Sequence, residues 1–144
     1  MTRTGTSKQV DSIFAIGRLR KAVAFHEVAR LALEHIDRVG DPDPVASNAI
    51  LAAIAYTDAL TAAYGGRANQ KDHASAVKLL RDTLGKALPD AQERRLSRLL
   101  ARKDEVQYGS RAGRNPEAEL IRESLDEYGI WARTMLAARS VSMP

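Results

Sequence analysis

The segment from Val45 to Tyr64 constrains the fold more than any other, because it is apolar around nearly its whole circumference. Alanine, isoleucine and leucine fill most of its positions, and Asp58 is its one charged residue. A helix of this composition is normally buried on most of its faces. Its length of about 30 Å matches a bilayer, but Asn48, Thr57 and Thr61 make it too polar for one. We therefore expect the central helix of a soluble bundle, with no membrane association.

Amphipathic segments flank this central helix and provide surfaces that can cover it. Their apolar residues recur at spacings of three and four, and no segment alternates apolar and polar residues as a half-buried strand does. Glycines and prolines, which are turn and helix-end signals, separate the segments. The further helices that we expect cover residues 10–39, 72–84 and 89–107 and the segment that begins at Asn115.

Together these elements predict an all-α fold, an antiparallel up-and-down bundle of about five helices. A chain of 144 residues has the size of one domain. We assign this domain to residues 9–139, with a flexible tail at residues 1–8 and another at residues 140–144.

Missing residue types and motifs exclude several classes of site. The chain has no cysteine, which excludes disulfides, thiolate metal sites and cysteine nucleophiles. It also lacks the phosphate-binding loop of P-loop enzymes, the zinc-protease helix motif and the serine-hydrolase motif. His26 and His35 share no helix face and have no third ligand in the sequence. We expect no metal or other cofactor. The N-terminus has no apolar leader, which favours a cytoplasmic protein.

The basic residues are mostly arginine, which accounts for 16 of the 22 in a chain of net charge +4. Arginine offers a planar fork that matches phosphate, although a genome rich in G and C produces the same bias. Arg95, Arg98 and Arg102 recur at helical spacing in the helix expected at 89–107. They form either a basic stripe for a ligand or an ordinary solvated face.

Several polar residues are expected to meet at one end of the bundle. In an up-and-down bundle, residues 64–73 and 102–115 belong to the same end. A phosphate-rich ligand suits such an end, because arginines and helix N-termini both attract anions, although a capped, solvated helix end has the same composition. The expected ligand or RNA contacts are Arg67, Asn69, Lys71, Arg98, Lys103, Arg111 and Arg114.

Asp58 is a separate case, because it lies in the most apolar helix of the chain. A buried carboxylate must be paired or hydrogen-bonded. We expect an ion pair with an arginine of a neighbouring helix.

Residues 96–109, Leu-Ser-Arg-Leu-Leu-Ala-Arg-Lys-Asp-Glu-Val-Gln-Tyr-Gly, resemble the fourth-helix signature of HEPN domains. The helix start at residues 116–119 and the Trp-Ala-Arg of residues 131–133 are similar to the last helix of this family. Residues 53–60 are similar to its buried second helix, and Asp72-His73 resembles a subgroup common in actinobacterial genomes. The resemblance covers residues 20–138.

The resemblance implies a helical bundle that is often dimeric. Many HEPN proteins are metal-independent endoribonucleases of toxin–antitoxin or other defence systems. Others are non-catalytic or pair with a small nucleotidyltransferase. The catalytic pattern of the family is an arginine, a polar residue and then a histidine, with four to six residues between arginine and histidine. Arg102 and Lys103 match its start, but Tyr108 stands where the histidine would be. A tyrosine, with a pKa of about 10, is a poor base at neutral pH.

Three hypotheses follow. The first is a non-catalytic or degenerate HEPN-type module that binds RNA, a nucleotide or a partner protein in a bacterial defence or toxin–antitoxin context. The second is a metal-independent endoribonuclease with a composite site: Arg102 holds the phosphate, His73 or Tyr108 contacts the ribose hydroxyl, and Asp72 orients His73. The third is a structural homo-oligomer. The expected partners are a second copy, RNA, and a cognate nucleotidyltransferase or antitoxin protein.

Overall fold

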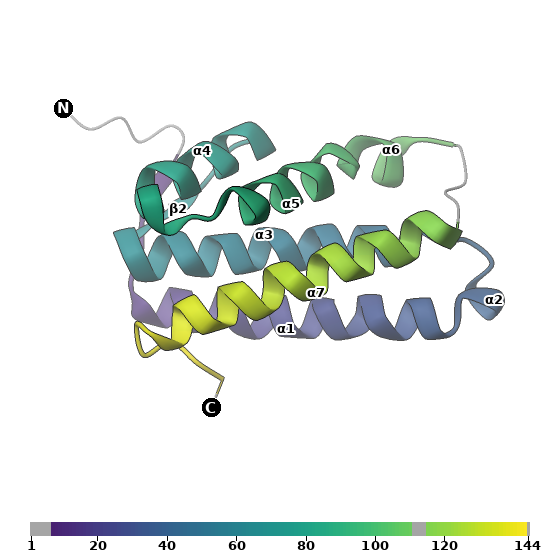
Figure 1. Cartoon of the computed structure of the whole chain (residues 1–144), viewed down its shortest axis with the longest axis horizontal. Helices are drawn as coiled ribbons and strands as arrows, with labels where there is room; N and C mark the ends of the chain where they lie inside the picture. Colours follow the sequence, from purple (N-terminus) through teal and green to yellow (C-terminus); the bar gives the residue numbers. More distant parts are fainter. Residues whose placement is uncertain (1–6, 111–114, 144) are drawn as a thin grey trace.

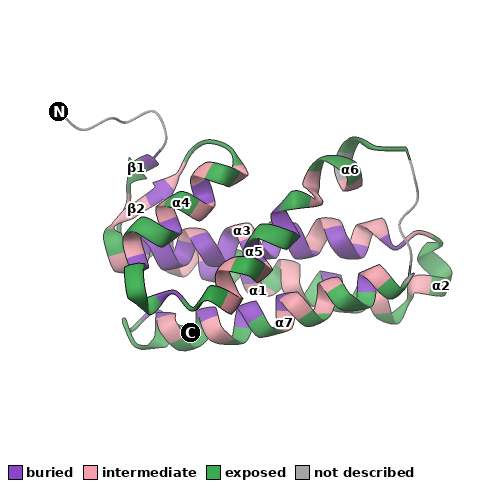
Figure 2. Ribbon diagram, turned by 45° about the horizontal axis from the view of Figure 1, so that its top comes forward, coloured by how far each residue is buried: buried purple, intermediate pink, exposed green. Residues whose placement is uncertain are grey.

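Helix α3 (Asp43–Gly65) is the centre of the fold in the computed structural model, which describes residues 7–110 and 115–143. Thirteen of its residues are buried, and most of these are alanine. Small side chains let neighbouring helices approach closely, so α3 contacts helices on several sides. Figure 2 shows the buried residues running along α3 beneath the other elements. The expectation of a buried central helix is confirmed.

Two long helices, α1 (Ser12–Glu34) and α7 (Asn115–Ala137), lie alongside α3 (Figure 1). The side chain of Asp11 caps α1 by accepting a hydrogen bond of 3.0 Å from the N–H of Phe14. The helix expected over residues 10–39 is interrupted at His35, and the short α2 (Ile36–Val39) follows. Gly40 then ends α2 with a φ of 79°, a conformation that glycine adopts without strain.

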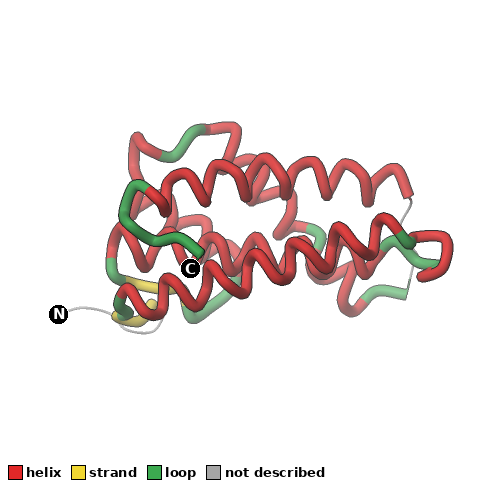
Figure 3. The backbone as a smooth tube through the Cα atoms, turned by 90° about the horizontal axis from the view of Figure 1, so that it is seen from below, coloured by secondary structure: helices red, strands yellow, loops and turns green. Residues whose placement is uncertain are grey.

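A second layer of shorter helices covers another side of α3 (Figures 1 and 3). It consists of α4 (His73–Leu84), the 3-10 turn η1 (Gly85–Ala87), α5 (Asp90–Ala101) and α6 (Lys103–Tyr108). Arg81, near the end of α4, forms an ion pair of 2.7 Å with Glu93, near the start of α5. Helices α4 and α5 are therefore antiparallel. The helix expected over residues 89–107 is divided at Arg102, where α5 ends and α6 begins.

A small antiparallel sheet joins the start of the chain to the end of α3. Strand β1 (Ser7–Gln9) pairs with β2 (Arg67–Asn69), and Ser7 lies opposite Asn69. We expected no strand and placed residues 7 and 8 in a flexible tail. Both expectations were wrong, because three-residue strands are too short to show an alternating pattern.

Because of the sheet, α4 also runs in a different direction from the expected one. Strand β2 carries the chain back along α3, so α4 runs in the same direction as α3 (Figure 1). The two helix ends therefore meet: the side chain of Thr83 lies 2.9 Å from the position that a Cβ atom would take at Gly65. The chain is an all-α helical bundle, as predicted, but α4 does not keep the expected alternation of helix directions.

The C-terminal end of α7 is also more ordered than expected. The N–H of Val141 donates to the carbonyl of Leu136 at 2.9 Å, and the N–H of Ser140 donates to that of Ala137 at 3.0 Å. Ser140 has a φ of 60°. This is the pattern of a Schellman motif. Val141 is buried in the core, so residues 140 and 141 belong to the packed domain and not to a tail.

Helix α3 is the one described helix whose length and composition would allow it to cross a membrane. In its most apolar window of 18 residues, 72% of the window is buried inside the bundle. The neighbouring helices thus cover the surface that lipid would contact.

Candidate functional site

The residues expected at one end of the bundle are divided between two regions of the molecule. The Tyr64 hydroxyl donates to the carbonyl of Met135 at 2.7 Å, close to the end of α7. Arg102 instead contacts Glu117, near the start of α7. Glu117 and Met135 are about 27 Å apart along the helix axis at 1.5 Å per residue. The expected single basic end is therefore not formed.

Arg67 and Asn69 are occupied by the small sheet. The Nε atom of Arg67 donates to Ser7 Oγ at 2.8 Å, and its Nη2 donates to the Ser7 carbonyl at 3.0 Å. The side-chain amide of Asn69 donates to the carbonyl of Asp72 at 3.1 Å. These contacts hold β1 and the turn before α4 in place. Lys71 is exposed in that turn.

Asp72 and His73 stand at the start of α4, but their side chains have separate roles. The Asp72 carboxylate accepts the N–H of Ser75 at 2.9 Å, which is an N-cap contact. This hydrogen bond lowers the pKa of Asp72. Among the described residues, no hydrogen bond joins Asp72 to the His73 ring. The proposed orienting role of Asp72 therefore gains no support from its geometry.

The imidazole of His73 lines a hollow of about 540 Å³ between α4 and α5, with Ser97, Leu100 and Asp104 on the facing side. Burial lowers the pKa of His73, and the positive charge of Lys103 lowers it further. The proximity of His73 to Lys103 and Asp104 agrees with the expectation that the start of α4 lies beside the end of α5. A lowered pKa leaves the imidazole neutral at pH 7.

Arg102 is directed toward α7. Its Nη1 atom lies 2.5 Å from Glu117 Oε2, and it lines a second hollow, of about 490 Å³, between α5 and α7. Glu117 was expected only as part of a helix start and not as a site residue. Arg102 and His73 line different hollows, which meet at Ala101, and among the described residues no contact joins the two side chains, so the composite site stays a prediction.

Tyr108 lies at the end of α6 and is 78% exposed. Among the described residues, no hydrogen bond or ion pair to its hydroxyl is found that could activate it. Arg111 and Arg114 lie outside the described residues, so their part in a site stays a prediction.

The arginine row of α5 borders a groove against α7, here called the α5–α7 groove. It consists of two adjoining hollows that share Arg98, Glu123 and Ser124. Arg95, Arg98 and Arg102 line its α5 side. Within the described part of the chain, Arg95 and Arg98 have no ion pair, so their charges are available to a ligand.

The opposite side of the groove is acidic and its floor is apolar. Glu117, Glu123, Asp126 and Glu127 of α7 line this side. The floor at the Arg102 end is formed by Leu99, Leu120 and Ile121. Leu120 is 62% exposed, so much of its side chain is open to a ligand. The groove thus has basic residues on its α5 side, acidic residues on its α7 side and an apolar floor at the Arg102 end.

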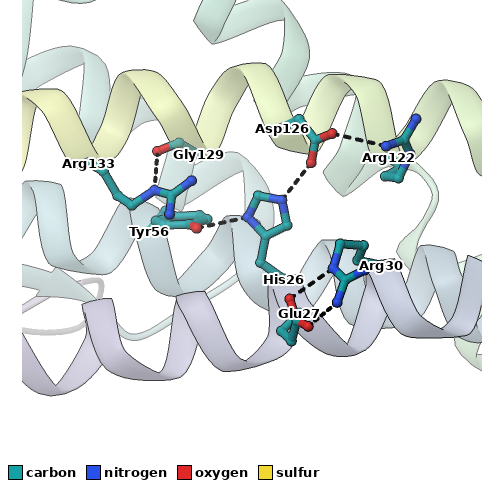
Figure 4. A network of polar contacts seen from close by, with 8 residues as sticks. All are labelled: His26, Glu27, Arg30, Tyr56, Arg122, Asp126, Gly129 and Arg133. Atoms are coloured by element: carbon teal, nitrogen blue, oxygen red, sulfur yellow. Dashed lines mark hydrogen bonds and ion pairs between the residues drawn. The ribbon is translucent and has the colours of Figure 1, made fainter. Parts of the chain in front are cut away.

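A polar network that the sequence analysis missed connects the three long helices (Figure 4). The Nε2 atom of His26 on α1 lies 2.7 Å from Asp126 Oδ1 on α7, and its Nδ1 atom lies 2.9 Å from the Tyr56 hydroxyl on α3. The three residues are far apart in the chain, and His26 was weighed only with His35 as a metal ligand. No local pattern in the sequence identifies such a network.

The network has one consistent hydrogen-bond arrangement with neutral His26. Nε2–H donates to the Asp126 carboxylate, and Nδ1 accepts the proton of the Tyr56 hydroxyl. Burial raises the pKa of Tyr56, so the phenol remains protonated and can donate. Tyr56 is fully buried and His26 is 13% exposed. A buried phenol cannot reach a substrate, so the network is best suited to positioning the helices.

The network packs closely against Gly129. A Cβ atom there would lie 3.0 Å from His26 Cε1 and 3.1 Å from Tyr56 Cε2. The arginines near it extend the network toward the surface: Arg122 contacts Asp126 at 3.4 Å, and Arg133 donates to the Gly129 carbonyl at 3.4 Å (Figure 4).

The ion pair expected for Asp58 is confirmed. Asp58 on α3 contacts Arg18 on α1, with 3.1 Å between Oδ2 and Nη2. Burial raises the pKa of Asp58 to about 6, and the charge of Arg18 opposes this shift. The contact fixes the register of two central helices.

Among the described residues, no group of three or more histidine, aspartate or glutamate side chains could hold a metal ion. Comparison with protein-family models and with curated protein sequences finds no match to this chain.

Proposed function

We propose that this protein is a non-catalytic HEPN-type module that binds a partner protein in a bacterial defence or toxin–antitoxin context. One observation supports the non-catalytic part more than any other. Arg102, the residue that matches the start of the catalytic pattern, is ion-paired with Glu117, and His73 lines a different hollow. A ribonuclease of this kind needs its phosphate-binding arginine and its proton-transferring group at the same scissile bond.

Two features of the α5–α7 groove favour a protein over RNA as the ligand. Phosphates placed along Arg95 and Arg98 would also lie near Glu123 and Glu127 on the other side. The negative charges of the phosphates and of these carboxylates would repel each other. The apolar floor around Leu120 and Ile121 gives a protein side chain something to bury, whereas a phosphate backbone gains nothing there.

A metal-independent endoribonuclease is the second candidate, and one observation favours it. Burial and Lys103 lower the pKa of His73, so its neutral imidazole could accept a proton at pH 7. Lys103 could then hold the phosphate in place of Arg102. This candidate requires His73 to act without the Asp72 carboxylate, which caps α4.

Incubation of the purified protein with a mixed RNA pool in the presence of EDTA separates these candidates. We expect no cleavage at high protein concentration, and no difference between the wild type and His73→Ala, Lys103→Ala or Arg102→Ala. Arg94→Ala, an exposed α5 arginine outside the groove, is the matched control. Cleavage that His73→Ala abolishes, with its circular dichroism spectrum unchanged, would establish the endoribonuclease and overturn the non-catalytic proposal.

A further inference from the structure

We infer that the α5–α7 groove binds one amphipathic helix of a partner protein, with acidic side chains of that helix toward α5 and basic side chains toward α7. This inference rests on the proposed function and specifies where and what the module binds. Its first basis is charge. Arg95 and Arg98 on one side and Glu123 and Glu127 on the other have no ion pairs among the described residues.

The shape of the groove agrees with a helix. Arg95 and Arg102 are about 10 Å apart along α5, and Glu117 and Glu127 are about 15 Å apart along α7. A partner helix of two to three turns matches this length. Its apolar residues at positions i, i+3 or i+4 and i+7 would lie over Leu120 and Ile121.

A second copy of this chain fits the groove less well. A two-fold contact would place the groove of one copy against the groove of the other, so two hollows would face each other. Leu120 is the exposed apolar side chain lining the groove that could project into the partner copy. One added helix fills the hollow, whereas two facing hollows remain poorly packed, and unfilled space forfeits contact energy.

The charges of the two sides predict which helices bind. The probes are three 14-residue peptides with the same leucine stripe, each held helical by a side-chain crosslink on its outer face. One peptide has glutamate along one flank of the stripe and lysine along the other. The second has glutamate on both flanks, and the third has lysine on both. We expect the mixed peptide to bind the wild type about threefold to tenfold more tightly than either of the others.

Charge reversal on one side should change this preference in a defined direction. Arg98→Glu cancels the charge of Arg95 and leaves the α7 side acidic, so the mixed peptide should lose its advantage over the all-lysine peptide. Glu123→Lys cancels the charge of Glu127 and leaves the α5 side basic, so the mixed peptide should lose its advantage over the all-glutamate peptide. Arg94→Glu and Glu119→Lys make the same charge changes on exposed positions of the same helices outside the groove. These controls should keep the preference for the mixed peptide. Fluorescence anisotropy at low salt measures all of these affinities.

Each alternative occupant of the α5–α7 groove would give a different experimental result. Equal affinity for the three peptides, no binding of any of them, or a response to Arg94→Glu as large as that to Arg98→Glu overturns the inference. A dimer in sedimentation that Arg98→Glu dissociates assigns the groove to a second copy and overturns it too. Tight binding of a uridine oligonucleotide that Arg98→Glu abolishes assigns it to nucleic acid. If no peptide binds and the protein does not cleave RNA, this inference fails but the non-catalytic function is not refuted. RNA cleavage that depends on His73 refutes the non-catalytic function itself.

Discussion

At the scale of single residues, Asp58 illustrates how burial and pairing compete in this protein. Its carboxylate is 15% exposed and contacts Arg18 at 3.1 Å. Burial penalises the charged form more than Arg18 favours it, so the pKa rises to about 6. Arg18 Nε is buried without a hydrogen-bond partner. The pair therefore fixes the packing of α1 against α3 without being an efficient source of stability.

The raised pKa of Asp58 predicts a specific pH dependence. Between about pH 4 and pH 6 the native carboxyl binds a proton that the unfolded one has released, so its contribution to stability decreases as the pH rises. We expect the free energy of unfolding of the wild type, relative to Asp58→Asn, to fall by about 1–3 kcal/mol over this interval. Urea unfolding at a series of pH values measures it. The exposed Asp82→Asn is the control, and parallel curves for the wild type and Asp58→Asn would contradict the argument.

At the scale of elements, the ends of the helices decide how the chain enters and leaves the bundle. The Schellman motif after α7 places Ser140 at a φ of 60° and so brings Val141 back onto the core. A serine in this conformation is strained, because its Cβ approaches the backbone, whereas glycine is not.

Replacement of this serine should therefore stabilise the protein. We expect Ser140→Gly to raise the free energy of unfolding by about 0.5–1 kcal/mol. Thermal and urea unfolding measure the change. Ser142→Gly, two residues later and exposed, should give no gain. A loss of stability in Ser140→Gly would show that the left-handed conformation costs this serine little.

At the scale of the whole molecule, the contacts of His26 tie the three long helices together. The ring bridges Tyr56 of α3 and Asp126 of α7 from its place on α1 (Figure 4). Apolar packing alone permits small rotations of helices about their axes. Two directional hydrogen bonds from one ring permit far fewer, which explains how a core rich in alanine keeps one arrangement.

A double-mutant cycle tests this role. His26→Leu leaves the buried Tyr56 hydroxyl without its partner, and we expect a loss of about 2–3 kcal/mol. Removal of that hydroxyl as well, in His26→Leu/Tyr56→Phe, should cost less than the sum of the two single changes, by about 1 kcal/mol or more. Tyr56→Phe combined with Tyr64→Phe, whose hydroxyl bonds to Met135, is the control pair and should be additive. Additivity in both pairs would refute the coupling.

The sequence by itself determined the helices and the central place of α3. Helical periodicity, glycine and proline signals and an all-round apolar segment are local properties, and each is present in the chain without reference to its neighbours. The pairing of Asp58 with an arginine followed from the cost of burying a lone charge, although the sequence did not say that Arg18 would be the partner.

Only the tertiary structure decided which residues share a site. Three-residue strands too short to predict send α4 parallel to α3, and this separates Arg67 from Arg102. The rotation of α5 about its axis turns Arg102 toward Glu117 and away from the hollow of His73. His26 meets residues 30 and 100 positions away. Such contacts depend on how whole helices pack, because packing energy is summed over many side chains and no local pattern in the chain records it.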